Sequence, residues 1–288
     1  MIGWWVVLLG GGGLWLINRS IRRGLSAPRI RERGRPEGLP WREVSIPARN
    51  GKRLFAWFIP APRCGPALVI MHGWGGNAEM MLPLAAPLHA AGYGLLLIDA
   101  RCHGRSDDDS FASLPRFAED IESALDWLAA RPEIDTRRLG IVGHSVGAGA
   151  ALLVASRRLG VRAVVSLAAF AHPAAMMKRW LAAKRVPYWP FGAYVLAYVQ
   201  WVIGHRFADI APCNTIARVS CPVLLVHGAE DETVPVADAE RIHAGRASDA
   251  VELLLVPGSH DDYGDSGRQF AAVRDFLDRA LDARCFRI

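Results

Sequence analysis

Short apolar runs alternate along most of the chain with longer stretches in which apolar residues recur at helical spacing. The runs ALVIMH (67–72) and GLLLID (94–99) are continuous, as expected of strands buried on both faces. Between 116 and 130, in RFAEDIESALDWLAA, the apolar positions instead follow the spacing of one helix face. This alternation predicts a mostly parallel sheet with helices on both faces.

The same pattern places the remaining elements. Further strands are predicted at 138–142, 162–170, 222–228 and 251–257, and further helices at 77–91, 145–158, 236–246 and 269–283. Before them, WREVSI (41–46) and RLFAWFI (53–59) predict two strands joined by a turn at Asn50-Gly51, a pair typical of hairpins. We therefore expect an antiparallel hairpin at the edge of the sheet.

Residues 171–219 interrupt the alternation of strands and single helices, because about fifty residues separate two predicted strands here. It holds eight of the 25 aromatic residues of the chain, and no residue from Val186 to Gly204 is charged. One interpretation is a helical lid over an apolar substrate pocket that also touches lipid; the other is an insertion that only packs on the body. On the first interpretation the expected substrate-binding residues are Trp180, Tyr188, Trp189, Tyr194 and Tyr198.

The N-terminus begins with an uncharged apolar run, Ile2 to Ile17, which has tryptophans near its ends and four consecutive glycines. Arginines follow this run instead of preceding it, which is atypical of a cleaved signal peptide. We expect residues 1–18 to be a retained membrane segment, with a cleaved signal or a peripheral segment as alternatives. The positive-inside rule would then place the body on the cytoplasmic side of a bacterial inner membrane.

Composition and charge limit the remaining possibilities. The 288 residues are 51% hydrophobic, which suits one large domain, residues 41–288. The net charge of +6 is concentrated in 19–42, which holds eight Arg and two acidic residues, so 19–40 is expected to be a basic linker. A basic linker beside an otherwise neutral domain favours membrane lipid over nucleic acid as a partner. The five cysteines lack the spacing of a zinc site or a disulfide framework.

The candidate chemistry begins at GHSVG (143–147), which lies between a predicted strand and a predicted helix. A serine in such a turn is lifted out of the sheet, and flanking glycines remove side chains that would collide with neighbouring backbone. Free N–H groups at the start of the helix favour a developing oxyanion. We therefore expect Ser145 to be a nucleophile.

A serine hydroxyl needs a base, and the base needs an orienting acid. His260 and Asp231 each follow a predicted strand, and loops after parallel strands converge on one crevice. The glycine-rich loop HGWGGN (72–77) follows another strand, so the expected oxyanion donors are the N–H groups of Trp74 and Val146. Glu230 and Asp262 are alternative candidates for the acid, and Asp261 is a further carboxylate near the base. His72 and His144, which adjoin the site, are expected to be scaffold, and a catalytic pair of the adjacent Cys102 and His103 is not expected.

Over residues 41–283 the chain resembles the α/β-hydrolase superfamily, through HGWGGN, DARCHGRS (99–106), GHSVG and HGAEDETVP…GSH. Within it, the chain is similar to serine aminopeptidase-like and dienelactone-hydrolase-like members with an N-terminal membrane segment. The resemblance implies an α/β-hydrolase fold with a lid between its sixth and seventh strands, and the chain order Ser, Asp, His. Cys102 departs from the family pattern, which often has glycine there.

These features predict a serine hydrolase that cleaves carboxylic esters or thioesters of apolar, lipid-like acyl groups. It would need no metal and no organic cofactor. A peptidase or an acyltransferase of the same fold remains an alternative, and so does a non-catalytic membrane-bound interaction module. Asp209 is the one acidic residue in 171–219, which disfavours recognition of a peptide's free amine.

Overall fold

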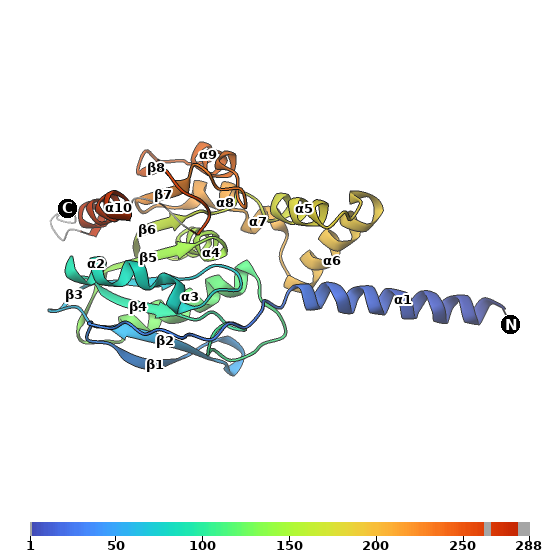
Figure 1. Cartoon of the computed structure of the whole chain (residues 1–288), viewed down its shortest axis with the longest axis horizontal. Coiled ribbons are helices and arrows are strands. Elements are labelled where there is room, and N and C mark those ends of the chain that lie inside the picture. The colour runs from blue at the N-terminus through green and yellow to red at the C-terminus, as the bar shows by residue number, and fades with distance from the viewer. Residues whose placement is uncertain (1, 262–265, 282–288) are drawn as a thin grey trace.

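A computed structural model describes residues 2–261 and 266–281, and its centre is an eight-stranded sheet (Figure 1). The strand order is β1-β2-β4-β3-β5-β6-β7-β8. The strands are β1 (Arg42–Pro47), β2 (Arg53–Ile59), β3 (Gly65–Met71), β4 (Gly94–Ile98), β5 (Ile134–His144), β6 (Val161–Leu167), β7 (Val223–Gly228) and β8 (Val251–Val256). All pairs from β4 to β8 are parallel, as the continuous apolar runs predicted.

The antiparallel edge of the sheet is the predicted hairpin. β1 pairs with β2, and β2 pairs antiparallel with β4. Asn50 and Gly51 both have positive φ, 59° and 66°, the conformation for which an Asn-Gly pair is suited. The turn therefore follows from local sequence alone.

Helices cover both faces of the sheet. They are α2 (Ala85–Ala90), α3 (Leu114–Ala129), α4 (Val146–Ala155), α9 (Val236–Ala244) and α10 (Ser266–Leu281), with a 3-10 helix at Ala78–Leu84. One apolar core joins the sheet to α3 and α4, and a second joins the opposite face to α2 and α10. This arrangement is the mostly parallel sheet with helices on both faces that the sequence predicted.

Between β6 and β7 the chain forms α5 (Pro173–Ala183), a π-helical turn (Tyr188–Gly192), α6 (Ala193–Ile203), α7 (Phe207–Ile210), α8 (Pro212–Thr215) and a 3-10 turn (Ile216–Arg218). This is the helical insertion expected at residues 171–219, called the lid below. Figure 1 shows α5 and α6 extending beyond one end of the sheet.

The N-terminal residues form helix α1 (Ile2–Gly24), which projects from the same end of the molecule as α5 and α6 (Figure 1). Across the described ranges, no helix is both long enough and apolar enough to cross a membrane. The prediction of a spanning segment at 1–18 is therefore not supported. Four glycines of low hydropathy interrupt the apolar run, and Asn18 and Arg19 follow it within the helix.

The basic linker has no helix or strand from Ala27 to Pro36, yet hydrogen bonds fix it against the body. Arg29 donates to the carbonyl oxygens of Gly104 and Ser106, at 2.9 and 2.8 Å. The N–H groups of Arg33 and Gly34 both donate to the Glu79 carboxylate at 2.8 Å. These hydrogen bonds from Arg29, Arg33 and Gly34 hold the basic linker in place.

Candidate active site

Ser145 occupies a strained turn between the end of β5 and the start of α4. Its φ of 53° and ψ of −115° lie in a region that non-glycine residues rarely adopt. A Cβ on Gly143 would come within 2.4 Å of the Gly147 carbonyl oxygen, and one on Gly147 within 2.5 Å of the His72 carbonyl oxygen. Only glycine fits at either position, so the GxSxG pattern follows from close backbone packing.

The structure brings the three expected triad residues together, although 86 and 29 positions separate them along the chain. His260 Nε2 lies 3.1 Å from Ser145 Oγ, and His260 Nδ1 lies 2.7 Å from Asp231 Oδ2. Both distances are within hydrogen-bonding range. The imidazole can therefore accept the serine proton while the carboxylate fixes its tautomer.

The Asp231 carboxylate is buried and held on both oxygens. Its Oδ1 accepts from the N–H groups of Thr233 and Val234, at 2.9 and 2.7 Å. These bonds turn Oδ2 toward His260. The rival acids bond elsewhere, because Glu230 accepts from the Gly258 N–H and Asp261 is exposed; Asp262 lies outside the described residues.

The loop of Trp74 and the start of α4, which carry the two expected oxyanion donors, both adjoin Ser145. Val146 is the first residue of α4, and a Cβ on Gly73 would lie 3.1 Å from Ser145 Cβ, so the loop that carries Trp74 contacts the turn. Within the described part of the chain, neither the Trp74 nor the Val146 N–H donates a hydrogen bond to protein. Both are therefore available to an oxyanion.

His72 fixes this loop. Its Nδ1 lies 2.7 Å from the Gly73 carbonyl oxygen, and its Nε2 accepts from the Ala100 N–H at 3.0 Å. Burial lowers the pKa of His72 to about 3, so the ring is neutral at physiological pH. A neutral ring with Nδ1 protonated satisfies both contacts and ties the loop after β3 to the loop after β4.

A family model described as "Serine aminopeptidase, S33" matches residues 65–212, just over half of the chain. The chain belongs to this family. It is a hydrolase of the α/β-hydrolase fold, as its motifs predicted. The match includes Ser145 and the loop of Trp74, whereas Asp231 and His260 lie beyond it.

Two curated relatives of this S33 hydrolase align along most of their length. The uncharacterised protein Rv2307c of Mycobacterium tuberculosis is 29% identical over 82% of this chain and 79% of its own. The uncharacterised protein YfhR of Escherichia coli K12 is 29% identical over 84% and 83%. A polyketide transferase, af380 of Aspergillus fumigatus, is 31% identical over 45% of this chain and 46% of its own.

Solved structures show the same fold. Esterase Pf2001 of Pyrococcus furiosus superposes with a TM-score of 0.73 at 21% identity, covering 89% of this chain and 98% of the esterase. Est1E of Butyrivibrio proteoclasticus, solved with ferulic acid bound, gives a TM-score of 0.65 at 21% identity, covering 83% of this chain and 99% of Est1E. At such identities the likeness extends to the fold alone.

In this S33 hydrolase, His144 has a role that the sequence indicated only as scaffold. Its Nε2 lies 2.9 Å from the His260 carbonyl oxygen, so the residue before Ser145 holds the loop that bears His260. Burial lowers the pKa of His144 and favours the neutral ring. A neutral ring protonated at Nε2 donates to that carbonyl.

The metal-binding potential of the site is limited by the same contacts. Donor atoms of His144, His260 and Asp261 lie within 4.8 Å of one another. His144 Nε2 is bonded to a carbonyl oxygen, and both His260 nitrogens contact triad partners. These donors therefore fit a triad and its support better than they fit a cation.

The five predicted substrate-binding residues lie on the outer lid. Tyr194 donates its hydroxyl to Asn18 at 2.6 Å, and Tyr198 accepts from Arg22 at 2.9 Å, so both contact α1. Trp180, Tyr188 and Trp189 are exposed. No contact described by the structure joins any of the five to the triad, and their role in substrate binding stays a prediction.

DARCHGRS is a buried brace beside the site. Ser106 Oγ donates to the Asp99 carbonyl oxygen at 2.7 Å, and buried Arg101 pairs with Asp120 at 2.6 Å. Cys102 has φ 66°, the left-handed conformation that glycine adopts most easily, which explains the family's preference there. The described cysteines are all unbridged; Cys285 lies outside the described residues.

Proposed function

We propose that this S33 hydrolase cleaves carboxylic esters or thioesters through an acyl-enzyme on Ser145. The observation that supports it most is the continuous chain of contacts from Asp231 through His260 to Ser145 Oγ. The family membership and the esterase fold neighbours point the same way.

In the proposed reaction Ser145 Oγ attacks the substrate carbonyl carbon while His260 Nε2 takes the hydroxyl proton. The N–H groups of Trp74 and Val146 stabilise the oxyanion, and His260 then protonates the leaving alcohol or thiol. Water repeats the sequence on the acyl-enzyme: His260 removes its proton, the acid is released, and the proton returns to Ser145. Neither a metal nor an organic cofactor takes part.

Transfer of the acyl group to an acceptor other than water is a second candidate. The partial likeness to the polyketide transferase af380 favours it, because the same acyl-enzyme serves both reactions. Peptide cleavage receives less support, since an aminopeptidase must pair with a free amine and Asp209 is the lid's sole acidic residue.

The test is a rate comparison over p-nitrophenyl esters of increasing chain length, with an aminoacyl anilide beside them. We expect turnover of the esters to exceed that of the anilide, and Ser145→Ala to abolish both. Faster anilide than ester cleavage would identify a peptidase. Ester cleavage that survives Ser145→Ala would contradict the mechanism.

A further inference from the structure

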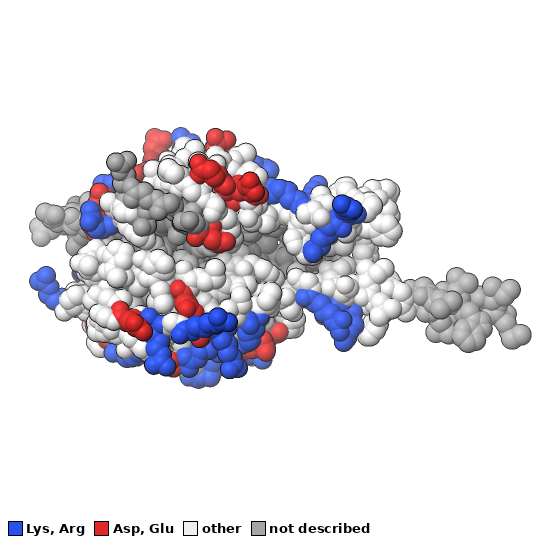
Figure 2. All heavy atoms as spheres, viewed as in Figure 1, with Lys and Arg blue, Asp and Glu red and all other residues white. Residues whose placement is uncertain are grey.

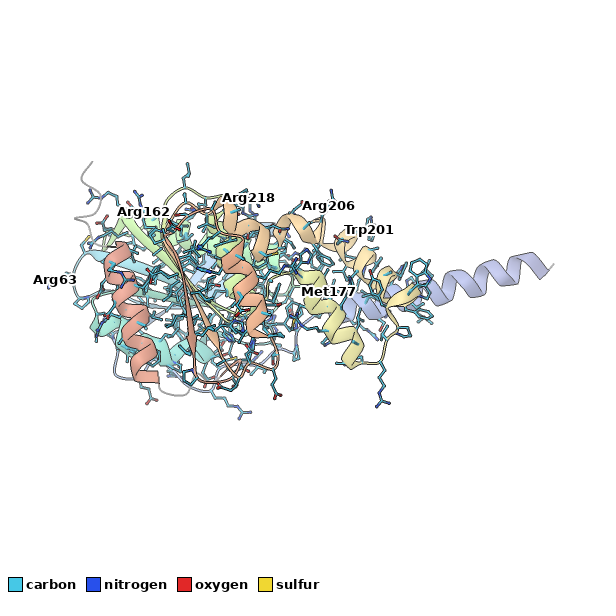
Figure 3. All side chains as sticks on the ribbon, turned by 90° about the horizontal axis from the view of Figure 1, so that it is seen from above. Arg63, Arg162, Met177, Trp201, Arg206 and Arg218 are labelled. Carbon is cyan, nitrogen blue, oxygen red and sulfur yellow. The ribbon has the colours of Figure 1, made fainter. Side chains whose placement is uncertain are left out.

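The end of the molecule formed by α1 and α6 exposes an unusual number of large apolar side chains. On α1 they are Leu14, Trp15, Leu16 and Ile17, and on the lid they include Phe191 and Trp201, which are 59% and 70% exposed. Figure 3 shows Trp201 at this end and Arg63 at the opposite end. We call these six side chains, together with the cavity described next, the α1–α6 face.

A cavity of about 600 Å³ lies between the two helices. Its polar lining includes Arg19, Arg22, Arg23, Ser26, Ser110 and Tyr198. The Arg22 guanidinium lies 5.9 Å from the ring centres of both Tyr198 and Trp201, and its Nε donates to Tyr198. Tyr198 and Trp201 therefore hold this arginine in place through its Nε and the face of its guanidinium.

The charged residues that line the cavity of the α1–α6 face are all basic. None of the residues lining the cavity is acidic, and among the described residues no carboxylate pairs with Arg19, Arg22 or Arg23. Figure 2 shows blue but no red on this view of the lid and of the described part of α1. A ligand of this surface must therefore combine negative charge with a large apolar area.

We propose that the α1–α6 face binds the surface of an anionic phospholipid bilayer, with a headgroup phosphate in the arginine-lined cavity. Exposed tryptophan and phenylalanine beside arginine is the composition of segments that lie in a membrane interface. Arginine donors suit phosphate oxygens, and each basic residue near an anionic surface strengthens attachment.

Hydrogen bonds from Tyr194 to Asn18 and from Arg22 to Tyr198 join the lid to α1, two segments 176 positions apart in the chain. The bilayer then contacts both at once. No chemistry at Ser145 is required, so this proposal stands apart from the proposed esterase activity.

The experiment is co-sedimentation of the full chain with vesicles of phosphatidylcholine, and with vesicles of equal parts phosphatidylcholine and phosphatidylglycerol. One variant, Arg19→Gln/Arg22→Gln/Arg23→Gln, removes the cavity charge; a second, Phe191→Ser/Trp201→Ser, removes apolar area. Matched controls are Arg63→Gln/Arg137→Gln/Arg246→Gln and Leu159→Ser, which change exposed residues elsewhere. Thermal melting confirms folding, and the single change Phe191→Ser replaces the double variant if that one unfolds.

We expect tight binding to the anionic vesicles, weakened roughly a hundredfold by the triple arginine change. The apolar variant should bind both vesicle types less tightly, whereas both controls and Ser145→Ala should bind as wild type. Equal binding to both vesicle types, or equal losses in the controls, would overturn the proposal. So would free glycerophosphoglycerol binding as tightly as the vesicles, which would identify a site for a soluble phosphate.

Discussion

The triad and the α1–α6 face are held by different kinds of interaction. At the triad, the Ser145 N–H donates to the Leu167 carbonyl oxygen at 2.8 Å, and neighbouring glycines leave no space for a side chain. At the α1–α6 face, side-chain hydrogen bonds from Arg22 and Tyr194 connect two exposed helices. Backbone packing therefore fixes the turn that carries Ser145, whereas side-chain hydrogen bonds connect the two helices of the second region.

This difference separates chemistry from attachment. A change at the triad should remove catalysis and leave most of the surface intact. A change on the α1–α6 face should alter what the protein attaches to and leave the triad distances intact. The predictions below test this separation, beginning with the largest effect.

Ser145→Ala should lower ester turnover about a million-fold, because no other described side chain offers a nucleophile that is hydrogen-bonded to His260 Nε2. Initial rates on a short p-nitrophenyl ester measure the loss. Leu159→Ser, on an exposed loop, is the control and should keep the wild-type rate. A comparable loss of turnover in that control would contradict the assignment of the chemistry to the triad.

Asp231→Asn should lower turnover about ten-thousand-fold, because an amide cannot hold the reactive tautomer of His260 in the same way. The same assay measures it. Asp261→Asn is the matched control, since that carboxylate is exposed and 3.8 Å from His144. If the Asp261 change were the more damaging, the acid would be misassigned.

His144→Phe should lower kcat roughly tenfold to a hundredfold with a smaller change in KM, because the loop of His260 loses its tether. His144→Gln, which keeps a donor, should recover part of the rate. Equal effects of both variants on KM alone would assign His144 to substrate binding instead.

Glu32→Gln should have the smallest effect, on the pH dependence of stability. Burial and the contact with Glu32 raise the pKa of Asp99 from 3.8 to about 8. The folded state then binds more protons at Asp99 than the unfolded state does between these values, so the contribution of Asp99 to stability is full below about pH 4 and is lost as pH rises toward 8. Replacing Glu32 should flatten this fall.

The expected shift is about 2–4 °C in melting temperature at the alkaline end for a change of about 1 kcal/mol. Melting curves of both proteins across this pH range measure it. A parallel fall in both proteins would mean that Glu32, on the linker between the two regions, does not influence Asp99.

The sequence predicted the elements of the first region well because local rules determine them. Continuous apolar runs identified the parallel strands, and Asn50-Gly51 identified the hairpin. The position of Asp231 and His260 directly after strands predicted that they lie near Ser145, since loops after parallel strands converge.

The second region was harder to predict. The contacts of Arg22 with Tyr198 and of Glu32 with Asp99 join residues far apart in sequence, and no periodicity signals them. The helix over Ile2–Gly24 follows from its apolar residues, but its packing on α6 does not. His144 was predicted only as scaffold, because only the folded loop shows the carbonyl oxygen that it bonds.

The central claim is that Ser145 forms the acyl-enzyme, and labelling with a fluorophosphonate followed by peptide mass spectrometry tests it most directly. The account predicts one stoichiometric adduct, located on Ser145, and none on Ser145→Ala or on wild type treated with the reagent after denaturation. Absence of labelling in the folded wild type, or an adduct that persists in Ser145→Ala, would contradict it.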